Sequence, residues 1–309
     1  MVPALQGYTA AVLEALSADE LAACASDLAS LDRAVAGQGE LRAALTDTAV
    51  LPAARRAVVA ELLDTKLGKP ASRLAAFAAF VASATDVPQA LGWLAQRARR
   101  ASEGQAEREP ALGVLGARTR VGGYARALFE NVELSALDAV EDELFRFART
   151  VEANRELRRA FTDRDLPVDA RIGLASQLLD GRVSPDTIKL AAYAVIGGRA
   201  RDFVGTLDFL VEETARARGW RVAKVRSAQE ITPASEASLA DTLSKITGNK
   251  VELQVSIDPS LLAGAIVELG DLRIDSTTRG RLNVLREHLG NDDYVPKFST
   301  NDRSEEGVA

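Results

Sequence analysis

The first hundred or so residues of the chain match the next hundred when they are shifted by 116 positions, and the match needs no gap. Identical residues fall on each other across this range, among them Gly7-Tyr8 on Gly123-Tyr124, Glu40-Leu41-Arg42 on Glu156-Leu157-Arg158, and Leu62-Leu63-Asp64 on Leu178-Leu179-Asp180. A constant offset over this length indicates two copies of one folded unit rather than a solenoid of short repeats. Residues after about 220 are not repeated, so the sequence predicts two like modules followed by a different one.

Both copies have the sequence pattern of a helical bundle. In the second copy, apolar residues recur at helical spacing over 124–132 and 137–147, and turn or capping residues separate six helical segments. Pro185 opens the fifth segment at the first helical position, where its missing N–H is not needed. The first copy repeats the same six elements. An apolar share of 47% with only 5% aromatic residues fits helices that pack through alanine and leucine.

The pattern changes after Gly219, where residues begin to alternate between apolar and polar as in a strand. Thr232, Pro233 and Glu236 together follow the pattern of a capped helix N-terminus. The elements predicted here are a strand at 221–228, a helix at 233–246, a strand at 251–257, a hairpin that turns at Gly270-Asp271, and a last helix over 275–289. The third module is therefore expected to be a small α+β domain.

The predicted fold is mainly α: two tandem six-helix bundles followed by a small α+β C-terminal domain. The segments are a first bundle over 1–100, a linker over 101–120, a second bundle over 121–219, the small domain over 220–290, and a disordered tail over 291–309. The linker is predicted because this range is rich in Glu, Arg, Gly and Ala and contains Pro110. The tail is predicted because it is polar, with five acidic residues against two basic ones.

Composition argues against several classes of protein. A formal net charge of -6 does not suit a general nucleic-acid binder, and the short basic cluster Arg97, Arg99 and Arg100 has no aromatic neighbours. Cys24 is the only cysteine, so no disulfide can form within the chain, which suits a reducing cytosol. We expect Cys24 to be a small packed residue rather than a reactive thiol. The N-terminus has no signal-peptide pattern, and no apolar run is long enough to span a membrane.

The sequence offers no cluster of residues for catalysis. His288 is the only histidine, and we expect it on the surface near the end of a helix. A phosphate loop is absent, because Gly248 has the wrong spacing and is better explained as a helix end, and there is no dinucleotide-binding motif either. We therefore expect a protein that is not an enzyme and needs no cofactor or metal. An enzyme or enzyme regulator would require a clustered polar site.

A groove that could hold another helix is the best candidate for a binding site. Small bundles rich in alanine have shallow grooves in which an amphipathic helix can lie. The candidate groove lies between the first and fifth helices of the second bundle and is formed by Tyr124, Ala127, Ala192 and Val195. The alternative is that these residues are plain core. The first copy keeps Tyr8, Ala11, Ala75 and Ala76 at or near the matching positions.

The last part of the chain carries a distinctive set of residues. They are Ala263-Gly264, Gly270-Asp271, Ile274-Asp275 and Arg279-Gly280-Arg281-Leu282. Their order and spacing resemble the C-terminal signature of the delta subunit of F-type ATP synthase, the bacterial equivalent of the mitochondrial oligomycin-sensitivity-conferring protein (OSCP). Residues 123–129 are similar to the first helix of that family, so the resemblance covers about 122–289. Ser276 stands where most relatives have glycine, and the first bundle is additional to an ordinary delta subunit.

The resemblance implies a non-catalytic stator subunit that links the top of the catalytic head, with its three alpha and three beta subunits, to the peripheral stalk. Such a subunit resists rotational torque during proton-driven ATP synthesis. It would bind N-terminal helices of alpha subunits in the groove of the second bundle. The third module would bind the b subunit, for which we select Leu262, Ile266 and Leu285.

The resemblance also places the chain at the cytoplasmic side of the cell membrane, attached only through b. The first bundle is expected either to bind a further helix, from alpha or b, or to act as a spacer. The alternative for the whole chain is a helical-repeat adaptor unrelated to ATP synthase, although an adaptor has no reason to carry the C-terminal signature.

Overall fold

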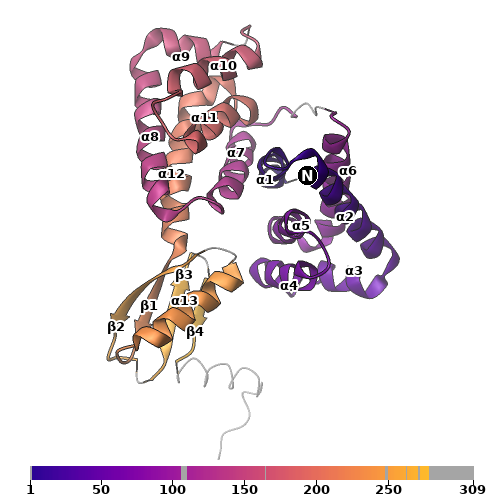
Figure 1. Cartoon of the computed structure of the whole chain (residues 1–309), viewed down its shortest axis with the longest axis vertical. Helices are drawn as coiled ribbons and strands as arrows, with labels where there is room; N and C mark the ends of the chain where they lie inside the picture. Colours follow the sequence, from indigo (N-terminus) through magenta and orange to yellow (C-terminus); the bar gives the residue numbers. More distant parts are fainter. Residues whose placement is uncertain are drawn as a thin grey trace, which may run out of the picture.

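The computed structural model describes residues 2–105, 110–163, 165–247, 250–261, 263–270 and 272–277, without the side chains of Asp64 and Trp220. In this part of the chain, two helical bundles lie side by side, and a small sheet with one helix lies at the end of the second bundle (Figure 1). The predicted fold class, mainly α with a small α+β domain, is confirmed. The tail, His288, Leu285 and the predicted last helix beyond Thr277 lie outside the described residues.

The first bundle has the six predicted helices. They are α1 (Pro3–Glu14), α2 (Ala18–Gly37), α3 (Gly39–Thr46), α4 (Pro52–Asp64), α5 (Lys69–Val81) and α6 (Val87–Ser102). Proline stands in the first turn of α1, α4, α5 and α6, where no N–H is missed. Helix α2 begins with a capping box, in which Ser17 and Glu20 satisfy each other's backbone N–H groups.

The second bundle repeats this plan. Its helices are α7 (Val114–Phe129), α8 (Leu134–Ala153), α9 (Arg155–Thr162), α10 (Val168–Leu179), α11 (Pro185–Gly197) and α12 (Phe203–Arg221). The bounds of α8, α9 and α11 equal those of α2, α3 and α5 shifted by the same 116 positions. Even the short 3-10 turn Ala84–Asp86 before α6 returns as Ala200–Asp202 before α12. The two copies of the sequence therefore fold into two copies of the same structure.

The linker between the bundles is shorter than predicted. Helix α6 continues to Ser102, and α7 already begins at Val114, so 114–120 are helical. The composition of this range resembles a linker, but Ala117 and Val121 are one turn apart and both are buried. Arg120 is buried as well, because its guanidinium donates hydrogen bonds to Gly197 O at 3.0 and 2.6 Å and to Pro110 O at 2.9 Å.

The third module is a four-stranded mixed sheet with one helix. Its elements are β1 (Val222–Ser227), α13 (Pro233–Thr247), β2 (Glu252–Ile257), β3 (Ala265–Leu269) and β4 (Leu272–Asp275). The strand order is β2-β1-β3-β4, in which β1 and β2 are parallel and the other neighbours are antiparallel. Gly270 has φ +56°, the left-handed conformation that the tight turn between β3 and β4 requires.

The side chains of β1 alternate between the two faces of the sheet. Val222 and Val225 are three positions apart, so they cannot share one face. The buried residues are Ala223, Val225 and Ser227, and Val222 lies on the opposite face. Ala223 and Val225 form a core with Val267 and with Leu243 of α13.

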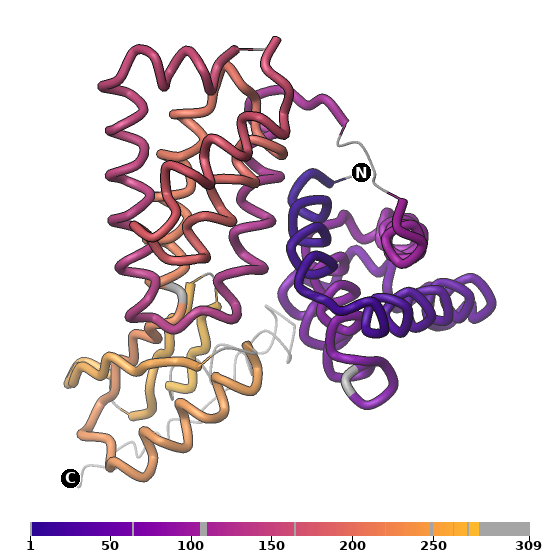
Figure 2. Tube along the Cα trace, turned by 45° about the horizontal axis from the view of Figure 1, so that its top comes forward, coloured from indigo at the N-terminus to yellow at the C-terminus, as the bar shows by residue number. Residues whose placement is uncertain are grey.

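Each module has its own hydrophobic core, but the two bundle cores touch each other. Ala127 of α7 belongs to the core of the first bundle, and Ala10 and Ala11 of α1 pack on the core of the second. Figure 2 shows α1 at the edge of the first bundle that faces the second. The contact between the bundles therefore involves the first helix of each.

Candidate functional site

Helices α1 and α7 are neighbours across the contact between the bundles (Figures 1 and 2). Their backbones come very close at two glycines. A Cβ atom on Gly7 would lie 1.8 Å from the carbonyl oxygen of Arg120, and one on Gly123 would lie 2.0 Å from that of Ala4. No side chain fits at such distances, so the crossing requires glycine at both positions. Gly7 and Gly123 are equivalent under the repeat, and so are Ala4 and Arg120. The two bundles thus form an internal pseudo-dimer with approximate two-fold symmetry.

Two tyrosine–glutamate hydrogen bonds obey the same symmetry. Tyr8 Oη donates to Glu130 Oε2 at 2.6 Å, and Tyr124 Oη donates to Glu14 Oε2 at 2.9 Å. Each ring also stacks on the fifth helix of its own bundle, Tyr8 on Phe77 and Tyr124 on Tyr193, with centroids 3.8 and 3.9 Å apart. Burial, with the nearby carboxylate, raises the pKa of both phenols, so both remain protonated donors at neutral pH.

The crossing covers most of the groove that the sequence predicted. Of the four groove residues, Tyr124, Ala127 and Val195 are buried, at 2, 3 and 5% exposure. Ala127 lies among the core residues of the first bundle, so α1 occupies the α7 side of the groove. Only Ala192 remains half-buried. For Tyr124 and Val195, the alternative interpretation as core residues describes the structure better.

The matching face of the first bundle is covered in the same way. Tyr8, Ala75 and Ala76 are buried, and Ala11 is half-buried against the second bundle. The helix that lies on this face is α7 of the same chain. Sequence reasoning missed this contact, although a signal was present: a glycine inside a helical pattern, at equivalent positions in both copies, is typical of a close backbone approach.

The outward side of α11 keeps an apolar stripe. Ile188, Ala192 and Ile196 follow one another at a spacing of four residues, so they share one face of the helix. Ile188 and Ala192 are half-buried, and Ile196 is exposed. This stripe is the open remainder of the predicted groove, and an amphipathic helix could lie along it.

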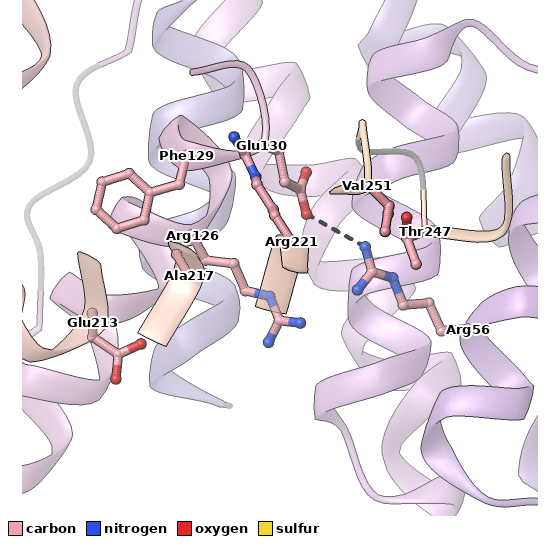
Figure 3. Close-up of a pocket in the computed structure, with 9 residues that line it drawn as sticks. All are labelled: Arg56, Arg126, Phe129, Glu130, Glu213, Ala217, Arg221, Thr247 and Val251. Carbon is pink, nitrogen blue, oxygen red and sulfur yellow. Dashed lines mark hydrogen bonds and ion pairs between the residues drawn. The ribbon is translucent and has the colours of Figure 1, made fainter. Parts of the chain in front are cut away.

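The two ends of the crossing differ in charge. At one end, Glu130 accepts hydrogen bonds from Tyr8, from Arg73 at 2.7 Å and from Arg56 at 3.3 Å. Arg126 lies over the rings of Phe77 and Phe80 at 5.7 and 5.0 Å. At the other end, the repeat places Ala10 and Ile172 at the positions of Arg126 and Arg56. The pseudo-symmetry is therefore broken by a cluster of arginines at one end, next to the third module (Figure 3).

The residues predicted to bind the stalk are only partly described. Leu262 and Leu285 lie outside the described residues. Ile266 lies in β3, between Arg226 of β1 and Asp275 of β4, and it is buried at 6% exposure. It is therefore not part of an open surface. The large apolar side chains that the described part of this module exposes are Ile246, Ile257 and Ile274.

Three further features of the sequence can be compared with the structure: the cysteine, possible metal ligands and possible membrane-spanning helices. Cys24 is buried at 3% exposure, and burial raises its pKa to about 11, as expected of a packed residue. Within the described ranges, no three His, Cys, Asp or Glu residues are grouped so that they could hold a metal ion. The same residues contain no helix with the length and hydropathy needed to cross a bilayer.

Comparison with known proteins gives consistent matches. The family model described as "ATP synthase delta (OSCP) subunit" matches residues 121–289. The "ATP synthase subunit delta" of Parafrankia sp. is 33% identical over 273 residues, which is 88% of this chain and 88% of the relative. That of Nocardioides sp. is 36% identical over 273 residues, with the same coverage. That of Corynebacterium urealyticum is 42% identical over 166 residues, 53% of this chain and 60% of the relative.

The two longer alignments also include the first bundle. Residues 121–309 are too few to supply 273 aligned positions, so the similarity extends well into 1–120. The first bundle, which is additional to an ordinary delta subunit, is therefore shared at least in part by these two relatives.

Proposed function

The chain belongs to the ATP synthase delta (OSCP) subunit family, and we propose that it is the stator subunit that ties the catalytic head to the peripheral stalk. The observation that carries this proposal is the family match over the second bundle and third module, together with relatives similar along most of the chain. The task of such a tie is mechanical: the rotating central stalk would drag the head around unless something held it. Its residues bind and resist torque during ATP synthesis, and none of them is catalytic.

We place the contact with the head on the second bundle. An N-terminal helix of an alpha subunit lies along Ile188, Ala192 and Ile196 of α11, the part of the predicted groove that α1 leaves open. A line of apolar side chains at one-turn spacing suits the apolar face of a partner helix. Buried apolar contacts of this kind supply most of the affinity in such interfaces, whereas exposed charges at the rim supply little.

The first bundle has a different role in this proposal. Its own helix-binding face is occupied by α7, so it braces the second bundle instead of receiving a second alpha helix. A subunit that transmits torque gains from stiffness. The glycine crossing and the two tyrosine–glutamate hydrogen bonds join the bundles through backbone contacts and buried polar contacts, which leave little freedom for relative motion.

The third module holds the b subunit. Its exposed apolar residues Ile246, Ile257 and Ile274 are the described candidates, and Leu262 and Leu285 remain candidates from the sequence. Because Ile266 is buried, it acts indirectly, by supporting the sheet. The chain would then be a peripheral protein at the cytoplasmic side of the membrane, attached through b.

Removal of residues 222–309 tests the division of labour. Helix α12 ends at Arg221, so this cut keeps both bundles whole. We expect the shortened chain to lose binding to a soluble b fragment in a pull-down assay and to keep its calorimetric affinity for an alpha N-terminal peptide. Retention of b binding would contradict the assignment. Loss of both partners, with an unchanged helical circular-dichroism spectrum, would contradict the separation of the two sites.

A further inference from the structure

Phe145 of α8 is the one aromatic residue among the large apolar side chains that the described part of the chain exposes, and its exposure is 49%. The guanidinium of Arg149, one turn later in α8, lies over the Phe145 ring at 5.4 Å from its centroid and also pairs with Asp208 of α12. Phe145 therefore lies beside the line along which α8 and α12 pack. Figures 1 and 2 show α8 on the side of the second bundle that faces away from the first bundle.

Charged residues on both sides of Phe145 connect α8 to α12. Along α8 they precede and follow Phe145 at spacings of three or four residues, so they share its face of the helix. The ion pairs are Arg149 with Glu152 and Asp208, and Arg218 with Asp138 and Glu141. Each of these charges has a partner, but four carboxylates against two guanidinium groups leave a surplus of two negative charges. The surface around Phe145 is therefore held by ion pairs and is acidic as a whole.

The first bundle shows that the fold itself does not need this surface. At the equivalent positions, α2 and α6 carry only small residues in place of the ring and the carboxylates, and yet they pack along each other as α8 and α12 do. The replacements are Ala29 for Phe145, Ala22 for Asp138, Ala25 for Glu141, Ala36 for Glu152 and Gly92 for Asp208. Exposed ion pairs contribute little to stability. Neither packing nor stability therefore accounts for the ring and its acidic surroundings.

We propose that the surface centred on Phe145 binds a basic segment of a partner protein. An arginine or lysine side chain of that segment lies on the exposed part of the ring, because the negative face of the π-system attracts a cation. The other basic side chains of the segment lie near the surrounding carboxylates. The stripe on α11 and the third module contribute no residue to this surface, so the contact is separate from those proposed above for alpha and b.

Two properties of the surface determine this choice of partner. The surplus of negative charge attracts a basic segment and repels an acidic one. The exposed ring, with Arg149 already in place over it, presents the types of side chain that most often dominate the binding energy of protein interfaces. A purely apolar partner would have to cover the ion pairs around Phe145 without offering them any charge, and this would cost desolvation free energy.

Fluorescence anisotropy of a labelled hexa-arginine peptide, titrated with the full-length chain, tests the proposal. Phe145→Ala is the informative variant, because alanine is the residue that the first copy carries at this position, as Ala29. Leu115→Ala is the matched control, because Leu115 is an apolar side chain on α7 with 80% exposure. We expect saturable binding of the peptide, about three- to fivefold weaker binding by Phe145→Ala, and unchanged binding by Leu115→Ala.

The charge of the partner is tested by two further measurements. Asp138→Ala, which again installs the residue of the first copy, should weaken binding of the peptide about twofold. Glu61→Ala, which removes an exposed carboxylate from α4 of the first bundle, should leave binding unchanged. A labelled hexaglutamate peptide should not bind. The proposal is overturned if hexa-arginine does not bind saturably, if Phe145→Ala or Asp138→Ala binds it as tightly as the unmodified chain does, or if hexaglutamate binds equally well.

Discussion

Replacing Gly123 with alanine is expected to destabilise the pair of bundles, although alanine is the better helix former. In an isolated helix, replacing glycine with alanine would stabilise the helix by about 1 kcal/mol. Here the new methyl group would lie 2.0 Å from the carbonyl oxygen of Ala4, which is backbone and cannot rotate away. The helices must separate, and overpacking of this kind costs about 1–3 kcal/mol or more. We expect a net loss near 2 kcal/mol, seen as a fall in Tm of roughly 4–8 °C by scanning calorimetry.

The structure provides both a partner variant and a control for this test. Gly7→Ala should behave like Gly123→Ala, because its methyl group meets the carbonyl oxygen of Arg120 at 1.8 Å. The double variant should lose less stability than the two single variants lose together, since one separation of the helices relieves both clashes. Gly173→Ala is the control: it lies within α10 with nothing within 4 Å, and it should raise stability by about 0.5–1 kcal/mol. If Gly123→Ala raised Tm as Gly173→Ala does, the close crossing would be refuted.

Ala192→Trp should abolish or greatly weaken binding of an alpha N-terminal peptide. Ala192 lies between Ile188 and Ile196 on the open stripe of α11, and an indole there would fill the space that the partner helix needs. A loss of at least tenfold in affinity, about 1.4 kcal/mol, is the minimum expected from blocking the centre of a helix interface. Isothermal calorimetry with the full-length chain measures it.

The control for the Ala192 variant is Ala136→Trp. Ala136 is an exposed alanine on α8, so the substitution adds the same apolar surface elsewhere on the second bundle. It should leave the affinity unchanged. Native affinity in the Ala192 variant, with a native circular-dichroism spectrum, would remove α11 from the head contact.

The helices of the two bundles could largely be predicted because the chain contains two copies of one sequence pattern, which can be compared with each other. Two copies with one pattern gave six helices each, and the proline positions marked several helix starts. The relation between the copies was not predicted, although the glycines at equivalent positions pointed to a close backbone approach. An apolar face with Tyr124 and Ala127 indicates that something covers it, but the same pattern fits a partner protein's helix or a helix of the same chain. Only the position of Gly7 against Arg120 distinguishes these cases, and that is a three-dimensional fact.

Two smaller errors have local causes. The linker was predicted too long because glycine and arginine interrupt the apolar face of 114–120. In addition, Arg120 can be buried because its guanidinium donates to the carbonyl oxygen of Gly197, which lies 77 residues away in the sequence. Ile266 was predicted as a surface contact, and it lies in a run of three consecutive apolar residues, Ala265 to Val267. Alternation then cannot tell which side chains face outward, and the position of β3 between β1 and β4 decides their burial.

In the proposed arrangement, the second bundle holds the head and the third module holds the stalk, while the first bundle serves as a brace. Cross-linking mass spectrometry of the intact complex with a lysine-reactive reagent tests it most directly. Lys189 is exposed on α11 beside the proposed alpha contact, Lys245 is exposed on α13, and Lys66 and Lys69 are exposed on the first bundle. We expect cross-links from Lys189 to alpha N-termini and from Lys245 to b. Cross-links of alpha N-termini to Lys66 and Lys69, with none to Lys189, would contradict it.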